Sequence, residues 1–321
     1  MPHTLRLMDL CRIIAIMLGR LRMSVDDCLN AYLELSEQIF TPARSGRNYL
    51  GQAIDFVYVN GKFDARILED VVKKCVAKYS SVGEKDVLLK LDEPCKVYGS
   101  YYLLWWVVRI EANCLYLHSF VVATRDSNSE PAVLRSYENP DYSQTVGDCK
   151  IWEACRATSA AKGFFESITV GKHNQTFSDG GVLYNNPVQL VHHEAGTVWP
   201  ERNALLISIG TGIAPGKRLA GNMKEVVDAI TNILTGTERT ANDFHKDHRA
   251  MVKDNLLFRF NVTRGLAQIG LAEYLEVGPI TDATETYLDE GETGQKMRAC
   301  VGILLETRSE GSLTSYSSSR N

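Results

Sequence analysis

Two short runs of apolar residues, each ended by polar residues or glycines, constrain the fold of this chain most strongly. The first covers residues 120–124, and the second covers residues 204–209 and stops at Gly210-Thr211-Gly212. Continuous apolar runs of this length are typical of strands covered on both faces, as in the middle of a parallel sheet. Helical patterns at residues 151–161 and 187–195 lie between them, so the sequence predicts an α/β domain with a mainly parallel central sheet.

Two further helices, each with one apolar face, are predicted nearer the start of the chain. Ser24 can cap a helix whose apolar residues recur at helical spacing as far as Ile39. Asp64 can cap a second helix with a similar stripe that reaches Val76. Residues 256–262 have the partial alternation of a late strand.

Charge and cysteine usage exclude several classes of protein. The chain has 35 Lys and Arg against 39 Asp and Glu, a formal net charge of -4, so no overall field attracts it to nucleic acid. Basic residues adjoin only in isolated pairs such as Lys73-Lys74, and we expect no nucleic-acid partner. The eight cysteines are irregularly spaced without a C-x-x-C pair, and the start has no signal-peptide pattern, which favours reduced thiols and a cytoplasmic location.

The strongest candidate for chemistry is the turn-rich block at residues 178–187. Asp179 precedes Gly180 and Gly181, and two adjacent glycines allow close backbone approach and positive φ, which fixes a carboxylate on a tight turn. Pro187 suits the first turn of a helix, with Asn186 as its cap. An aspartate held in this way can act as a general base, although turn chemistry alone also explains these residue types.

Taken together, four segments resemble the patatin-like phospholipases, the lipid acyl hydrolases of plants and fungi. The segments are residues 14–26, residues 157–161, the Asp-Gly-Gly block through Asn185-Asn186-Pro187, and residues 207–212. They occur in the family's order, and the chain is most similar to fungal-type members. The resemblance implies a three-layer α/β fold and peripheral contact with membranes, with phospholipid or another acyl lipid as substrate.

The resemblance also implies a Ser-Asp dyad that needs no metal or organic cofactor. A serine on a Gly-x-Ser-x-Gly elbow attacks the ester, and the aspartate that corresponds to Asp179 activates it. Gly180, Gly181, Asn185, Asn186 and Pro187 correspond to the rest of the aspartate motif. In the family a glycine-rich loop near the N-terminus builds the oxyanion hole.

The nucleophile is where the sequence departs from this pattern. No Gly-x-Ser-x-Gly occurs in the 321 residues, and aligning Ile14 with the helix after the elbow places the motif on residues 7–12, with Asp9 as nucleophile. A second carboxylate beside Asp179 supplies no alkoxide, and nearby Cys11 has no evident low-pKa setting. We therefore expect an N-terminally truncated, inactive chain that lacks the family's first strands. Because strand edges and sheet faces would stay uncovered, we expect the chain to be marginally stable or prone to aggregation.

A second departure is an inserted segment at residues 98–119. Its apolar stretch, residues 101–108, meets Arg109 and Glu111 after about ten residues, too few for a membrane-spanning helix. We hypothesise that the insertion and the atypical start derive from a translated intron or a misplaced start codon. The alternative is a genuine lipid-facing loop on a non-catalytic lipid-binding or regulatory protein.

The expected organisation has three parts. Residues 1–215 form a partial patatin-like domain, residues 216–305 a helical and strand extension of it, and residues 306–321 a disordered Ser-rich tail.

Other candidate sites have simpler explanations. His245 and His248, like His192-His193-Glu194, lack a further ligand at evident spacing, so solvated helix faces explain them better than a zinc site. The Gly210-Thr211-Gly212 loop lacks the further glycines or lysine of a phosphate-binding motif.

Overall fold

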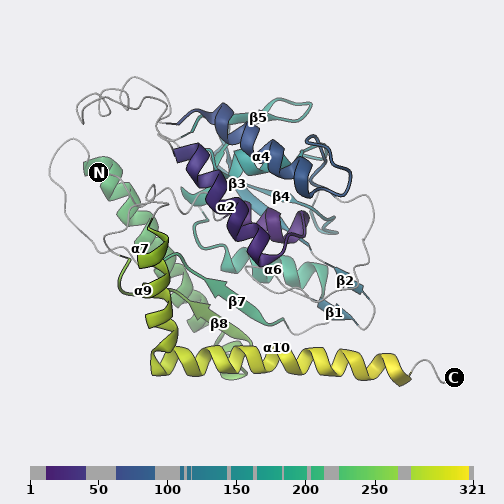
Figure 1. Ribbon diagram of the computed structural model, residues 1–321, viewed down its shortest axis with the longest axis vertical. Coiled ribbons are helices and arrows are strands. Elements are labelled where there is room, and N and C mark those ends of the chain that lie inside the picture. Colours follow the sequence, from purple (N-terminus) through teal and green to yellow (C-terminus); the bar gives the residue numbers. More distant parts are fainter. Residues whose placement is uncertain are drawn as a thin grey trace. The chain divides into compact units, whose positions relative to one another are not determined.

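The chain divides into two compact units, and each is described by itself. The first unit contains residues 1–90, 119–185 and 270–274, and the second contains residues 91–118, 186–269 and 275–321. Figure 1 shows the elements of both units. The computed structural model describes residues 12–40, 63–90, 109–111, 114–116, 118–142, 146–161, 165–182, 184–200, 204–212, 224–266 and 276–317.

The first unit begins with helices whose ends follow the predicted caps. A helical turn at residues 12–15 continues as the π-helix η1 (Ile16–Arg20), followed by α2 (Val25–Phe40) and α4 (Ala65–Tyr79). The Ser24 hydroxyl accepts a hydrogen bond from the Asp27 amide at 3.0 Å, and the Asp64 carboxylate accepts one from the Arg66 amide at 2.9 Å. Both predicted caps are therefore confirmed, and α2 and α4 lie side by side (Figure 1).

The main sheet of the first unit is antiparallel, so the prediction of a mainly parallel central sheet is wrong. Its strands are β3 (Phe120–Arg125), β4 (Pro131–Arg135), β5 (Ile168–Val170) and β6 (Gln175–Asp179), in the order β4-β3-β6-β5. The physical reason is loop length. Five residues join β3 to β4 and four join β5 to β6, whereas a parallel crossover needs a dozen or more.

The core of the first unit explains why the apolar run at 120–124 misled the prediction of strand direction. The first four residues of β3 are buried, and the strand packs against α5 (Ile151–Thr158). Burial of the whole run shows that both faces of the sheet are covered at β3, and both faces of an antiparallel sheet can be covered as well. The core side chains come from η1, α2, α4, α5 and the sheet, and they include Ile16, Leu35, Leu68, Val76, Ala123, Ile151 and Phe177.

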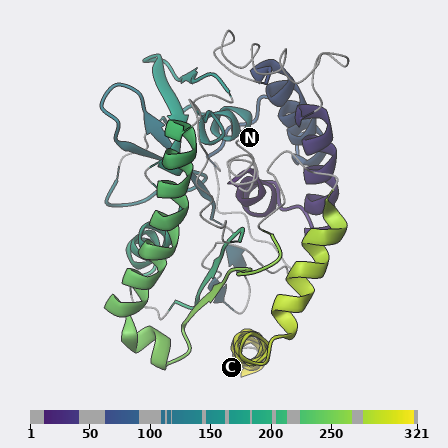
Figure 2. The same cartoon turned by 90° about the vertical axis from the view of Figure 1, so that its left-hand side faces the viewer.

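The second unit contains a parallel pair of strands between helices. Strands β7 (Leu206–Ile209) and β8 (Leu257–Phe260) confirm the predicted strands at 204–209 and 256–262 and pair in parallel, with Ser208 opposite Arg259. Figure 2 shows α7 (Lys224–Asp247) on one side of this pair and α9 (Val277–Asp289) on the other. The apolar cluster around Phe258, Phe260 and Cys300 joins β8 to α10 (Gly291–Ser317).

The remaining elements of the second unit bear on three expectations. Strands β1 (Arg109–Glu111) and β2 (Cys114–Tyr116) form an antiparallel pair within the predicted insertion, whereas the apolar stretch 101–108 lies outside the described residues. Helix α10 runs into the Ser-rich segment 306–321, where composition predicts disorder. None of the helices in the described part of the chain is long and apolar enough to cross a membrane. Helices α6 (Val188–Val198) and α8 (Arg249–Lys253) complete the unit.

Candidate functional site

Asp179 lies at the carboxyl end of β6, and its backbone is held on two sides. It pairs with Ala123 of β3 in the sheet, and the Thr124 hydroxyl donates a hydrogen bond to its carbonyl oxygen at 2.9 Å. The Asp179 amide donates to the carbonyl oxygen of Ala160, just after α5, at 3.0 Å. Only 4% of the residue is exposed, so the structure places the predicted base as a fixed, buried carboxylate.

Neither glycine after Asp179 has the predicted positive φ; close approach to the backbone explains Gly180, whereas Gly181 lies against the end of the Arg12 side chain. A Cβ on Gly180 would overlap the carbonyl group of Val122 in β3. A Cβ on Gly181 would overlap an Nη atom of Arg12 and lie 3.0 Å from the Asp179 carboxylate. Gly180 and Gly181 start the 3-10 turn η2 (Gly180–Val182), in which the Gly181 amide donates to Asp179 Oδ1.

Arg12 occupies the space next to this carboxylate. Its Nη1 atom forms an ion pair with Asp179 Oδ1 and donates a hydrogen bond to the Thr158 carbonyl oxygen at 3.1 Å. The Arg12 side chain is only 15% exposed, so the pair is largely shielded from water. Among the described residues, Asp179 Oδ2 is buried and has no hydrogen-bond partner.

Arg12 is the last residue of the segment that aligns with the Gly-x-Ser-x-Gly elbow, and the sequence predicts no role for it. The available signal is that Arg12 directly precedes an apolar helical segment, and a buried carboxylate needs a cationic or hydrogen-bonding partner. What the sequence lacked was any means of pairing two residues 167 positions apart. Asp9 and Cys11, the other residues weighed at the nucleophile position, lie outside the described residues.

Asn186 and Pro187 of the aspartate motif make hydrogen bonds at the start of helix α6. Asn186 Oδ1 accepts a hydrogen bond from the Val188 amide at 3.2 Å, as a capping side chain does, although α6 begins at Val188 and Pro187, not Asn186, is in the N-cap position. Its Nδ2 atom donates to the Thr237 carbonyl oxygen of α7 at 3.2 Å, and the Pro187 carbonyl oxygen accepts from Val191 at 2.8 Å. Asn185 is half-buried at the end of the first unit.

A second polar cluster in the second unit lies at the carboxyl ends of the parallel strands. Glu238 Oε1 accepts from Arg259 Nη2 at 2.7 Å and from Asn261 Nδ2 at 2.9 Å, and Arg259 Nη1 donates to the Ser208 hydroxyl at 2.9 Å. Asn261 Oδ1 in turn accepts from the Gly212 amide at 2.7 Å. The Gly210-Thr211-Gly212 loop, predicted only as the end of a core strand, is thus anchored to α7 through Asn261 and Glu238.

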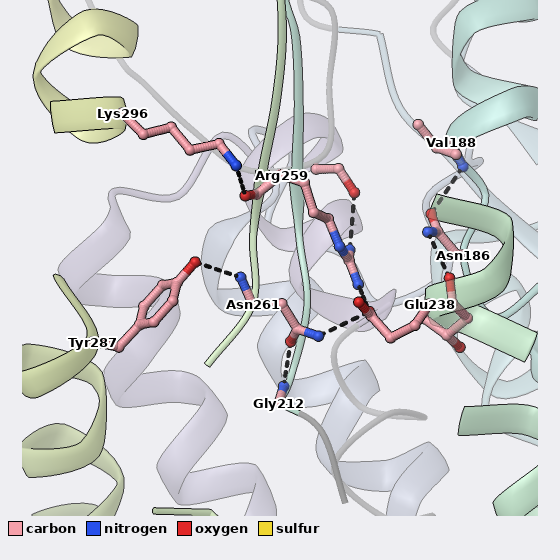
Figure 3. A network of polar contacts seen from close by, with 10 residues as sticks. Asn186, Val188, Gly212, Glu238, Arg259, Asn261, Tyr287 and Lys296 are labelled. Carbon is pink, nitrogen blue, oxygen red and sulfur yellow. Dashed lines mark hydrogen bonds and ion pairs between the residues drawn. The ribbon is translucent and has the colours of Figure 1, made fainter. Parts of the chain in front are cut away.

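Figure 3 shows the two sides of this cluster. Arg259 and Asn261 both reach Glu238, whereas Lys296 of α10 and Tyr287 of α9 approach the main chain from the other side. Lys296 Nζ donates to the Arg259 carbonyl oxygen at 2.8 Å, and the Asn261 amide donates to the Tyr287 hydroxyl at 3.2 Å. Burial lowers the pKa of Lys296 from its ordinary value. All of these partners belong to the second unit.

The structure brings together two histidines that the sequence placed in separate candidate metal sites. The rings of His192 and His248 meet edge to face with centroids 4.6 Å apart, and His248 stacks on Phe244 at 3.9 Å. Burial, followed by the neighbouring His248 and His193, lowers the pKa of His192. Within the part of the chain that the structure describes, no group of three or more His, Cys, Asp or Glu side chains could hold a metal ion.

Sequence comparisons assign a family to the chain that carries this buried Asp-Gly-Gly turn. Residues 13–192 match the family model "Patatin-like phospholipase", and the chain belongs to this family. The match ends within α6, so most of the second unit lies beyond it.

The phospholipase A2 relatives are distant and much longer than this chain. It is 25% identical over 255 residues to calcium-independent phospholipase A2-gamma of Rattus norvegicus and 26% identical over 261 residues to that of Homo sapiens. Each alignment covers 78% of this chain but only 29% of the relative, so the chain matches less than a third of their length. "Probable inactive patatin-like protein 9" of Arabidopsis thaliana is 30% identical over 112 residues, 28% of this chain and 29% of that protein.

Proposed function

We propose that this chain is a patatin-like protein of lipid metabolism that has lost ester hydrolysis. The ion pair between Arg12 and Asp179 is the observation that carries this proposal. In the dyad that the family resemblance implies, the aspartate must take a proton from a serine hydroxyl. Here Asp179 Oδ1 already accepts from a guanidinium and from the Gly181 amide, which leaves Oδ2 as the oxygen that could accept from a hydroxyl, and the sequence has no Gly-x-Ser-x-Gly serine to donate to it.

The printed sequence supports the same conclusion from the side of the nucleophile. None of the 321 residues belongs to a Gly-x-Ser-x-Gly motif, and a carboxylate without that serine has no hydroxyl to activate. One relative carries the word inactive in its name, which supports the idea that patatin-like chains without activity exist.

The proposed ligand is a phospholipid or another acyl lipid, because the family and the longer relatives are named as phospholipases. Contact with membranes would be peripheral, at a cytoplasmic surface. The origin of the chain as a truncated, fungal-type member with an insertion at residues 98–119 stays a prediction. Sequencing of the transcript tests it, because abundant message that contains both atypical segments in frame would contradict a translated intron or misplaced start.

A hydrolysis assay tests the loss of activity directly. The purified chain is mixed with phosphatidylcholine vesicles and, separately, with a short-chain p-nitrophenyl ester, and its rate is compared with those of Asp179→Asn and Asp126→Asn. Asp126 is an exposed acid of the same unit and serves as the matched control. We expect all three rates to equal that of buffer. Hydrolysis that Asp126→Asn retains and Asp179→Asn abolishes would overturn the proposal.

A further inference from the structure

Three groups from different elements converge on the guanidinium of Arg12. The Asp179 carboxylate comes from the end of β6, the Thr158 carbonyl from the end of α5, and the hollow left by the missing Gly181 side chain from the turn η2. The Thr158 side chain and the Asp179 backbone are held by contacts that do not involve Arg12. The Thr158 hydroxyl donates to the Val122 carbonyl oxygen at 2.8 Å, and Asp179 is held by Thr124 and Ala160.

We infer that these groups form a guanidinium-binding seat, and that its occupant in this chain is Arg12. The inference rests on the proposed function in one respect, since Asp179 can serve the seat only if it is not engaged in catalysis. It assigns the retained Asp-Gly-Gly motif a binding role, with the guanidinium group as the class of ligand that it takes.

The geometry matches a planar guanidinium better than an ammonium ion. Arg12 Nη1 bridges the Asp179 carboxylate and the Thr158 carbonyl, while Nη2 fills the position where a Gly181 side chain would begin. A Cβ there would also lie 3.3 Å from Arg12 Cζ, so the methyl group of an alanine at position 181 would crowd the guanidinium. Lysine presents a compact point charge and cannot occupy both positions at once.

The Asp179 carboxylate has an oxygen that can accept a further hydrogen bond from such a ligand. Asp179 is 4% exposed, and its Oδ2 atom has no hydrogen-bond partner among the residues that the structure describes. A carboxylate offers two oxygens to the two parallel donors of a guanidinium, so a small guanidinium ion freed from the Arg12 chain can contact both. Removal of the Arg12 side chain would leave a buried anion that selects this ligand.

Chemical rescue tests the seat without any substrate. In the full chain, Arg12→Ala should lower the melting temperature by about 10 °C, because one partner of a buried ion pair is lost. Millimolar guanidinium chloride should then raise it in a saturable way, as expected for a ligand that binds only the folded state. Equal concentrations of sodium chloride or methylammonium chloride are the controls and should restore little of the loss.

Two further variants separate binding at the seat from a general salt effect. The double variant Arg12→Ala/Asp179→Asn lacks the anion and should show no rescue. Gly181→Ala should lower the melting temperature of the natural chain and should block rescue in the Arg12→Ala background, since the methyl group fills the hollow. Equal rescue in all backgrounds, or no saturable rise in Arg12→Ala, would overturn the inference.

A measurement on the natural chain keeps the test decisive if Arg12→Ala does not fold. Nitrogen-detected NMR of the Arg12 side chain should show separate Nη signals and slow proton exchange, and both should be lost in Asp179→Asn. A freely rotating, rapidly exchanging Arg12 guanidinium in the natural chain would refute the seat. Ester hydrolysis by the natural chain would instead contradict the proposed function, while rescue and NMR would still report on the seat.

Discussion

Replacement of Glu238 by alanine tests whether the polar cluster in the second unit stabilises the fold. The substitution removes the acceptor shared by Arg259 Nη2 at 2.7 Å and Asn261 Nδ2 at 2.9 Å. Arg259 is 8% exposed, and among the described residues its guanidinium would keep the Ser208 hydroxyl as its remaining partner. Hydrogen bonds to charged groups contribute about 1.5–3 kcal/mol each, and the loss of one partner of a buried pair costs about 3–5 kcal/mol.

Solvent reduces this cost, because the Glu238 side chain is 32% exposed and water can replace part of what Arg259 loses. We therefore expect the free energy of unfolding to fall by about 3 kcal/mol in Glu238→Ala. Urea denaturation measures this loss. Asp243→Ala in the same helix is the matched control, because Asp243 is 49% exposed and its ion pairs with Arg239 and Lys246 are long, at 3.8 Å and 3.5 Å. Exposed pairs of this kind contribute about 0.5 kcal/mol or less.

Two outcomes would refute the reasoning. Glu238→Ala and Asp243→Ala could lose equal stability, which would show that the cluster contributes no more than a surface pair. Alternatively, Glu238→Ala and Arg259→Met could lose stability additively, although residues in one hydrogen-bonded network should show coupling.

Three further predictions concern packing, pH and lipid contact. Gly180→Ala should lower the free energy of unfolding by about 2 kcal/mol, because its Cβ would overlap the Val122 carbonyl group. Gly196→Ala, at a position in α6 where a Cβ meets no other atom, should be neutral or stabilising. Equal effects of the two substitutions in urea denaturation would contradict this. Burial raises the pKa of Cys28 from 9.0 to about 12, so the thiol loses its proton at a lower pH in the unfolded chain than in the folded chain. The free energy of unfolding should therefore fall as pH rises above 9. Cys28→Ala should make this dependence on pH less steep. If residues 101–108 form a lipid-facing loop, Trp105→Ala and Trp106→Ala should reduce co-sedimentation with phosphatidylcholine vesicles, and a natural chain that stays in the supernatant would refute this alternative.

Features set by a few neighbouring residues were predictable from the sequence. The caps at Ser24 and Asp64 depend on atoms within three positions along the chain, and the structure has both. The turn at Asp179 is equally local, because the Gly181 amide donates to the Asp179 side chain two positions earlier.

Features that depend on distant partners were not predictable in the same way. The apolar run in β3 reads the same in a parallel or an antiparallel sheet, and only the short loops that flank its partners decide the direction. The pair of Arg12 with Asp179 joins residues 167 positions apart, and Asn261 meets Gly212 across 49 positions. Such contacts follow from the three-dimensional path of the chain, which no local pattern encodes.

The π-helix η1 also affects how the chain tolerates a change of length. In η1 the Leu21 amide donates to the Ile16 carbonyl oxygen at 2.9 Å, so the turn contains one residue more than an α-turn. Deletion of the half-buried Leu18 would let the same hydrogen bond close an ordinary α-turn, and Arg12 would keep its position. A deletion inside α4 would instead rotate the apolar stripe of Leu68 and Val76 by about 100°. The segment directly after Arg12 can therefore lose one residue in evolution while the helix that carries Arg12 stays in place.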